Sequence, residues 1–150
     1  LAKSDSPELI ASEDVLGALW LAQGQYARAE PILARRYQRL RGTARGDLYR
    51  LSVYGVNDQM GRVMSGQGRW AEARRYFEQA VQILSNGQPH NPYLAMTRAR
   101  YGLCLLALGD RLGAIRQADL AARTLRDNKS LAQRFQEPLS QLRSRLEEVQ

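Results

Sequence analysis

The side chains that could do catalytic or metal-binding chemistry are few in this chain and lie far apart. Histidine occurs once, at His90, and cysteine once, at Cys104. One histidine and one cysteine cannot form a histidine pair, an intramolecular disulfide or the usual zinc ligand sets. Cys104 stands in the apolar stretch GLCLLAL without a basic neighbour, so we expect a buried packing residue rather than a nucleophile. The sequence therefore predicts no catalytic residue, no metal site and no cofactor.

Neither the glycines nor the adjacent carboxylates form a recognisable site. The 12 glycines include no GxGxxG pattern after a strand and no GxxxxGK[ST] pattern, which are the two motifs that hold phosphates. Glu13 and Asp14 stand early in a predicted helix, where the helix dipole favours negative charge. An enzyme is kept as a rival interpretation that requires several ionisable groups to converge in one pocket.

The net charge of +7 comes from 22 basic and 15 acidic residues. Such a balance suits a nucleic acid or an acidic protein as partner. The basic residues, however, are scattered along the chain in runs no longer than two. We therefore expect that nucleic acid is not the partner, and keep a nucleic-acid-binding array as a rival that requires the arginines to gather on one surface.

Length and composition indicate a globular protein without a membrane span. The 150 residues, 44% hydrophobic and 25% charged, suffice for one domain with an ordinary core. The longest apolar stretches, VLGALWLA and YGLCLLALG, are far shorter than the ~20 residues that cross a bilayer. With one cysteine and no leader sequence, we expect a cytoplasmic location. Because the chain begins at Leu1, we also expect a fragment or a processed form.

Three 18-residue windows of the sequence align without gaps, and they indicate how the chain is organised. They are LGALWLAQGQYARAEPIL from Leu16, MGRVMSGQGRWAEARRYF from Met60 and YGLCLLALGDRLGAIRQA from Tyr101. Three columns are identical in all windows: Gly17/Gly61/Gly102, Gly24/Gly68/Gly109 and Ala29/Ala73/Ala114. Intervals of 44 and 41 residues between the windows are typical of stacked supersecondary units.

Each identical column has a structural explanation in a pair of antiparallel helices. The second glycine stands where the first helix must end, and a positive φ at this position turns the chain. The first glycine lies seven residues earlier on the same helix. We expect it to face the alanine of the third column, because two small residues let the helices approach closely. The repeating unit is therefore predicted to be a helical hairpin.

Capping residues and loops predict where the helices begin and end. Ser6 and Asn91 each precede a proline at a first helical position, and Asp47 can cap the helix that follows it. Pro31 is tolerable in the second turn of its helix, whereas Pro138 should kink or interrupt the last one. The predicted helices cover residues 7–23, 26–41, 47–67, 70–85, 92–108, 111–126 and 130–148.

The order of small residue, large apolar residue, glycine, aromatic residue and A-E-A resembles the tetratricopeptide repeat. The intervals exceed the usual 34 residues of that family and are similar to the roughly 42-residue variety of kinesin light chains and many bacterial proteins. A His-Pro-x-Val-Ala loop commonly opens the first helix in that variety, and HNPYLA at 90–95 matches it with one inserted asparagine. YARAEPIL also resembles the family's second helix. Two asparagines common in the first helix of family members are absent, and Ala11, Asp14 and Ala18 replace the residues that clamp a C-terminal carboxylate.

This resemblance implies one all-α domain, a right-handed α-solenoid of three hairpins with a C-terminal capping helix. The hairpins would occupy about residues 7–41, 47–85 and 92–126, and the capping helix about 130–148. The resemblance also implies a non-catalytic scaffold that binds a protein or peptide on its concave face, which the first helix of each hairpin lines. We expect it to be a segment of a larger bacterial signalling, regulatory or secretion protein.

By the register of the family, a partner would contact one face of the first helices. The expected partner-binding residues are Arg50, Tyr54, Asp58, Arg62, Ser65, Asp14, Leu21, Met96 and Leu103. Charges in the middle and apolar residues at the ends suit an extended peptide or an amphipathic helix. Two alternatives stay open: the Arg and Asp side chains only pair with each other across turns, or the array forms a homo-oligomer through its last helix or an open end.

Overall fold

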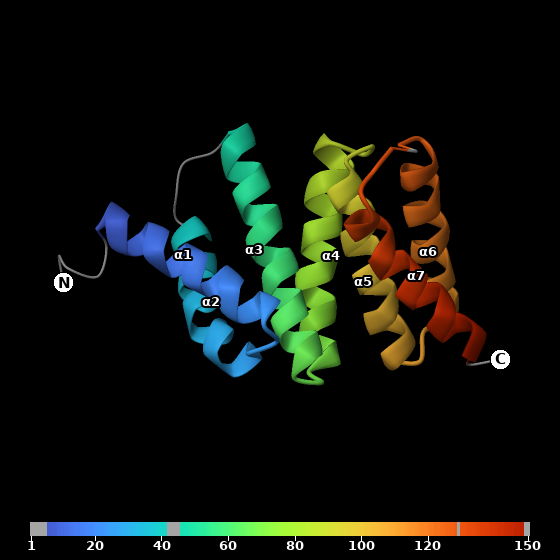
Figure 1. Ribbon diagram of the computed structural model, residues 1–150, viewed down its shortest axis with the longest axis horizontal. Helices are drawn as coiled ribbons and strands as arrows, with labels where there is room; N and C mark the ends of the chain where they lie inside the picture. The colour runs from blue at the N-terminus through green and yellow to red at the C-terminus, as the bar shows by residue number, and fades with distance from the viewer. Residues whose placement is uncertain (1–5, 42–45, 129, 149–150) are drawn as a thin grey trace.

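The computed structural model describes residues 6–41, 46–128 and 130–148, and these residues form seven α-helices without a strand (Figure 1). The helices are α1 Pro7–Ala22, α2 Tyr26–Arg41, α3 Asp47–Gly66, α4 Trp70–Gly87, α5 Pro92–Ala107, α6 Arg111–Arg126 and α7 Gln133–Glu148. Every predicted helix is present, and its ends lie within three residues of the prediction. None of the helices in the described part of the chain is long and apolar enough to cross a membrane.

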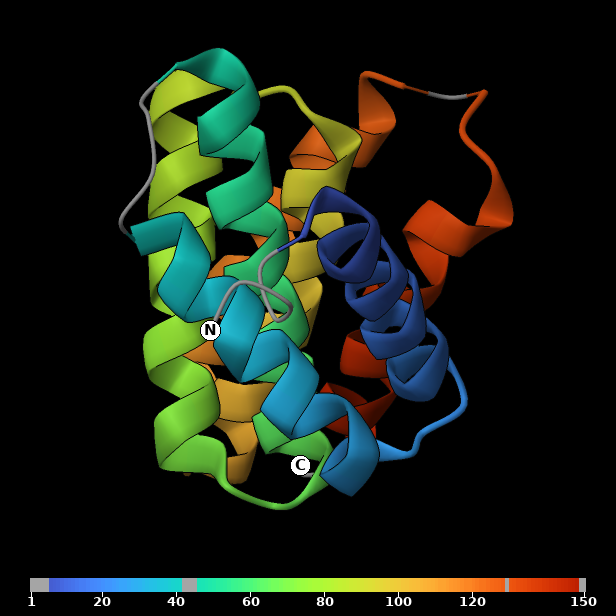
Figure 2. The same ribbon diagram turned by 90° about the vertical axis from the view of Figure 1, so that its left-hand side faces the viewer.

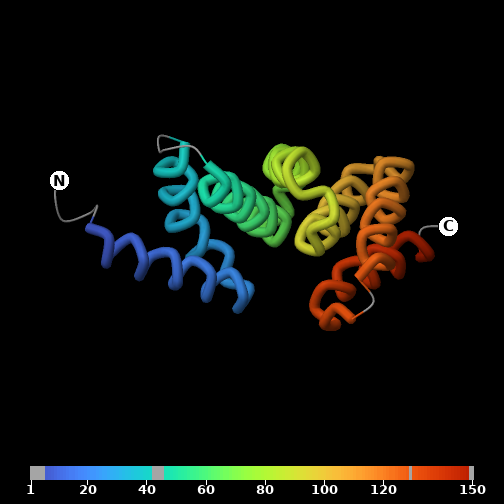
Figure 3. The backbone as a smooth tube through the Cα atoms, turned by 90° about the horizontal axis from the view of Figure 1, so that it is seen from above, coloured from blue at the N-terminus to red at the C-terminus, as the bar shows by residue number. Residues whose placement is uncertain are grey.

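Consecutive helices pack in pairs, α1 with α2, α3 with α4 and α5 with α6, and the pairs stack side by side as an α-solenoid. The seventh helix, α7, packs against both α5 and α6. Seen from above (Figure 3), α1 and α7 lie at opposite ends of the array but on the same side of it. This arrangement leaves the faces of α3 and α5 between them.

The turn inside each hairpin is built on the second glycine column. Gly24, Gly68 and Gly109 have φ angles of 70°, 72° and 85°, which lie in the left-handed region that favours glycine. The residue after each glycine donates its N–H to the carbonyl oxygen five residues earlier, at 2.8 Å in all three turns. This is the Schellman bond that ends a helix, so the predicted role of these glycines is confirmed.

At the first glycine column the two helices of a hairpin approach closely, but the residue that lies nearest to each glycine differs from the prediction. A Cβ atom on Gly61 would lie 2.6 Å from Cε1 of Phe77, and one on Gly17 would lie 3.1 Å from Cδ2 of Leu33. The predicted alanines Ala29 and Ala73 are not the nearest neighbours of these glycines, whereas the carbonyl oxygen of the third alanine, Ala114, lies 3.4 Å from the Cβ position of Gly102. Helical side chains lean toward the N-terminus of their helix, so the residue one turn beyond the alanine covers the glycine instead.

The third hairpin lacks this bulky residue, and α7 supplies it. Ala118 stands at the position that Leu33 and Phe77 occupy in the first two hairpins. The atoms nearest to a Cβ on Gly102 belong to Leu142 of α7, whose side chain is fully buried. The last helix therefore completes the core of the third hairpin.

The capping residues agree with the prediction at two helices and differ at a third. The Ser6 hydroxyl oxygen accepts the N–H of Leu9 at 3.2 Å, and Oδ1 of Asn91 accepts the N–H of Tyr93 at 2.9 Å. Asp47 is not the cap of α3: it is the first helical residue, and Gly46 precedes it at the capping position.

The proline in the last helix does not interrupt it. Pro138 is buried inside the continuous helix α7. It is the sixth residue of the helix, so its missing N–H removes only one hydrogen bond, to the carbonyl of Arg134. Burial of the ring against the core offsets this loss.

Candidate binding groove

A groove of about 820 Å³ lies on the side of the array where α1 and α7 stand. Six of the seven helices contribute to it, all except α6. Its lining includes Leu21 of α1, Tyr26 of α2, Arg62, Ser65 and Gly66 of α3, Trp70 and Phe77 of α4, Arg100, Leu103, Leu106 and Ala107 of α5, and Gln141, Ser144, Arg145 and Glu148 of α7. The groove is thus walled by helices from both ends of the sequence.

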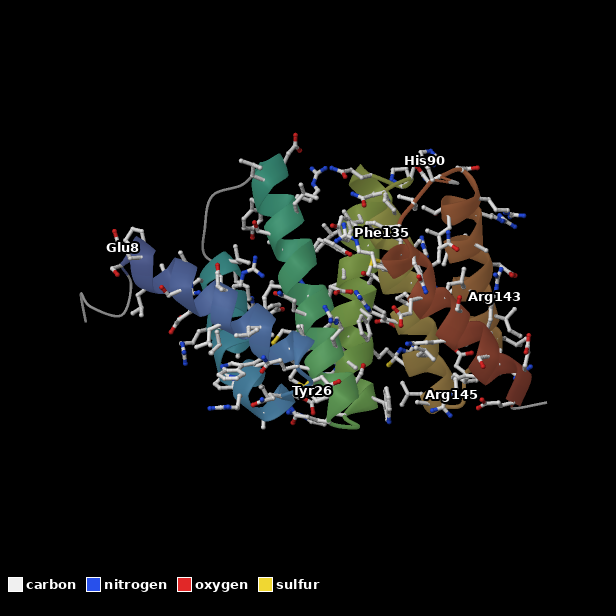
Figure 4. The ribbon with its side chains drawn as sticks, viewed as in Figure 1. Glu8, Tyr26, His90, Phe135, Arg143 and Arg145 are labelled. Atoms are coloured by element: carbon white, nitrogen blue, oxygen red, sulfur yellow. The ribbon has the colours of Figure 1, made fainter. Side chains whose placement is uncertain are left out.

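Most of the groove wall is apolar, and its shape depends on one residue without a side chain. The ring of Tyr26 lies directly against the backbone of Gly66, where a Cβ atom would clash with it. Leu103, Leu106 and Trp70 are half-buried and pack against the core while they line the groove. Figure 4 shows Tyr26 and Arg145 at the same end of the helices, at the bottom of the view.

Arg62 places a positive charge in this apolar surface. Its side chain is half-buried, and its guanidinium forms no hydrogen bond or ion pair with the residues that the structure describes. Burial lowers its pKa, the neighbouring charge of Arg100 lowers it further, and Asp58 opposes the shift. A partly desolvated guanidinium without an acceptor in the protein can form charge-assisted hydrogen bonds with an anionic group in the groove.

The neighbouring Arg100 is held by an acidic partner. Its Nη1 atom lies 2.9 Å and 3.1 Å from the two carboxylate oxygens of Asp58, and the Thr97 hydroxyl donates to the same carboxylate at 2.7 Å. The Tyr54 hydroxyl lies 2.8 Å from Oγ1 of Thr97 and donates to the carbonyl of Tyr93 at 3.1 Å. These groups form one buried polar chain between α3 and α5.

The structure distributes the nine predicted partner-binding residues over several environments. Four of them line the groove: Leu21, Arg62, Ser65 and Leu103. The expectation that Tyr54 and Asp58 present free side chains beside them is wrong, because both are buried between α3 and α5. Burial raises the pKa of the Tyr54 hydroxyl, and the charge of Asp58 raises it further. Asp58 also pairs with Arg100 of the next hairpin, not with an arginine one turn away.

The remaining three predicted residues lie outside the groove. Asp14 pairs with Arg36 and Arg39 of α2, at 3.5 Å and 3.4 Å. Arg50 is exposed at the start of α3, 4.0 Å from Asp47. Met96 is half-buried against the core. A role of the nine residues in partner binding stays a prediction.

Sequence reasoning missed the contribution of α7 to the groove. Gln141, Arg145 and Glu148 line it at intervals of four and three residues, so they share one helix face. Because α7 packs beside α5, it stands where the first helix of a fourth hairpin would lie. Had the last helix been interpreted as the first helix of a fourth hairpin, and not only as a cap, this face of α7 would have been among the predicted partner-binding surfaces.

Neither the single histidine nor the single cysteine lines the groove. His90 is exposed at the opposite end of the helices from Tyr26 and Arg145 (Figure 4). Cys104 is buried, its thiol donates to the carbonyl of Trp70 at 3.2 Å, and burial raises its pKa to about 11. No group of three His, Cys, Asp or Glu side chains that could hold a metal ion occurs among the described residues.

Comparison with known proteins agrees with this architecture. A comparison with curated proteins finds no match. The family model of the tetratricopeptide repeat matches residues 49–127, which is just over half of the chain and covers α4, α5, α6 and all but the first two residues of α3. Repeats of this family are non-catalytic and mediate protein interactions. The match, the glycine turns and the stacked hairpins together show that the chain belongs to the tetratricopeptide repeat family.

Proposed function

We propose that the chain is a non-catalytic scaffold whose groove binds a segment of a partner protein, with an acidic side chain of that segment on Arg62. The observation that carries this proposal is the unpaired, half-buried guanidinium of Arg62 within a largely apolar groove. A carboxylate can accept two parallel N–H bonds from a guanidinium, and such charge-assisted bonds are stronger than neutral ones.

The apolar wall of the groove indicates which other side chains the partner segment carries beside its acidic residue. Leu103, Leu106 and Trp70 offer half-buried surface that gains from burial against aliphatic or aromatic side chains. A segment with a carboxylate between bulky apolar residues fits this surface, either as an amphipathic helix or as an extended peptide. The net charge of +7 favours the approach of an acidic segment.

A nucleic-acid partner is less well supported by the charge distribution. Arg35, Arg36 and Arg39 on α2 are all paired with Glu13 or Asp14. Two carboxylates therefore offset most of the positive charge of these three arginines within the first hairpin. The apolar groove wall offers no match for a phosphate backbone, which is bound chiefly by free basic side chains.

The proposal can be tested with a displayed library of random peptides selected on the immobilised chain. The enriched peptides should carry Asp or Glu next to bulky apolar residues, and they should lose binding to the variant Arg62→Met, which keeps the length of the side chain without its charge. Arg75→Met is the matched control, because Arg75 is exposed on α4 and does not line the groove. Enriched peptides that lack acidic residues, or that bind Arg62→Met as well as the unaltered chain, would contradict the proposal.

A further inference from the structure

Asp58 and Arg62 stand four residues apart on α3, a spacing that places both side chains on one face of the helix. An acidic residue four positions before a basic one is the favourable order for an ion pair within a helix. The residues that the structure describes nevertheless include no ion pair or hydrogen bond between these two side chains. The charge of Asp58 raises the pKa of Arg62, so the two groups interact through space without contact.

The carboxylate of Asp58 is held instead by two side chains of α5. Nη1 of Arg100 lies 3.1 Å from Oδ1 and 2.9 Å from Oδ2 of Asp58, and the Thr97 hydroxyl donates to Oδ1 at 2.7 Å. Among the described residues, Arg100 is the one donor to Oδ2. The helices α3 and α5 are the first helices of neighbouring hairpins, and α3 stands in front of α5 in Figure 2. The acceptor that Arg62 would find on its own helix is therefore occupied by the next hairpin.

Two guanidinium groups thus compete for one carboxylate. The side chain of Asp58 is 8% exposed, and a buried carboxylate that loses its cation is strongly destabilising. Arg62 and Arg100 line the same groove, and the charge of Arg100 lowers the pKa of Arg62. The arginine that does not hold Asp58 is the one that keeps its donors for the groove.

We propose that Arg100 is a positioning residue of the groove, which holds the carboxylate of Asp58 and thereby keeps Arg62 free to bind an acidic side chain of a partner. This inference rests on the proposed function of the groove. Without Arg100, Oδ2 of Asp58 would lose its donor, and the Arg62 guanidinium would turn to it and leave the groove. The third hairpin in this way controls the charge that the second hairpin offers to a partner.

Unfolding by urea tests this competition without any partner. In the unaltered chain, Arg62→Met should not lower the folding equilibrium constant, because Arg62 has no described acceptor to lose. In the Arg100→Met background, the same substitution should lower the constant about tenfold or more, because Arg62 then holds the buried carboxylate. An equal effect of Arg62→Met in both backgrounds would overturn the proposal.

Arg98→Met is the matched control background. Arg98 is also half-buried on α5, but it donates to Gln117 at 3.0 Å and not to Asp58. Arg62→Met should have no more effect in this background than in the unaltered chain, and a tenfold loss here too would overturn the proposal. The double variant Asp58→Asn/Arg100→Met removes both charges of the buried pair and should fold. If it folds while Arg100→Met alone does not, Arg62 cannot replace Arg100, and the proposal is overturned.

The binding of a glutamate-containing peptide, selected from the displayed library on the unaltered chain, measures the consequence for the groove. Arg100→Met should weaken its binding about tenfold or more, because Asp58 then takes the guanidinium of Arg62. Addition of Asp58→Asn should restore the binding, since no carboxylate competes for Arg62. A double variant that binds as weakly as Arg100→Met would overturn the positioning role, because Arg100 would then contact the peptide itself. If no acidic peptide is selected, the proposed function fails alone, because the urea measurement needs no peptide.

Discussion

Glycine has two separate functions in each hairpin, and they make different demands on the residue. At Gly68 the backbone φ of 72° needs glycine whatever the surrounding space. At Gly61 the backbone is helical, and the limit is the ring of Phe77. The identity of both columns in three windows made their positions predictable from the sequence. The partner of Gly61 was not predictable, because it depends on the direction in which side chains of the second helix lean.

Substitution of Gly61 should measure the cost of this close approach. Gly61→Ala is expected to reduce the free energy of unfolding by about 1–3 kcal/mol, because the Phe77 ring is buried and cannot move aside. Denaturation by urea gives the difference. Gly55→Ala in the same helix is the control: no atom lies within 4 Å of its Cβ position, so the higher helix propensity of alanine should raise stability by up to about 1 kcal/mol. Equal gains at both positions would contradict the packing described for Gly61.

The ion pair between Asp58 and Arg100 should contribute far more to stability than an exposed pair. Asp58→Ala is expected to cost roughly 3 kcal/mol, since it leaves Arg100 and Thr97 without their shared acceptor in a largely buried site. Arg74→Ala breaks an exposed pair with Glu78 and should cost about 0.5 kcal/mol or less. Urea denaturation gives the free energy of unfolding of both variants. Similar losses of stability would show that the buried polar chain between α3 and α5 is not structurally important.

At the scale of the elements, the helices were largely predictable and their detailed packing was not. Apolar periodicity, Ser6 and Asn91 predicted where helices lie, and the structure confirms them. The cap of α3 was predicted one residue too late, at Asp47 instead of Gly46, because glycine can also occupy a capping position. The continuity of α7 through Pro138 depends on tertiary burial, which the sequence alone does not reveal.

The contribution of α7 to stability can be tested at Leu142, the residue of α7 that packs into the core of the third hairpin. Leu142→Ala should lower the free energy of unfolding by about 2–5 kcal/mol, because Leu142 fills the space over Gly102 that Ala118 leaves. Leu146 lies one turn later and is only half-buried, so Leu146→Ala should cost clearly less. Chemical denaturation of the two variants distinguishes them, and an equal loss would mean that α7 does not complete this core.

At the scale of the whole molecule, the groove joins residues that are far apart in the sequence. Leu21 and Glu148 lie near opposite ends of the chain and line the same groove. The rule that first helices face the partner placed Leu21, Arg62, Ser65 and Leu103 on one surface, and all four line the groove; their contact with a partner stays a prediction. It failed for Tyr54 and Asp58, because it does not say how deeply α3 and α5 bury their shared face.

Arg62 is expected to bind a carboxylate of the partner, and a double-mutant cycle measures this contact. Calorimetry would give the dissociation constants of a library-selected peptide and its Glu→Gln form, each with the unaltered chain and with Arg62→Met. The two changes should each weaken binding about tenfold or more, and together hardly more than either alone, which corresponds to a coupling of at least about 1.4 kcal/mol. Losses that simply add would contradict this contact, because Arg62 and the acidic side chain would then act independently.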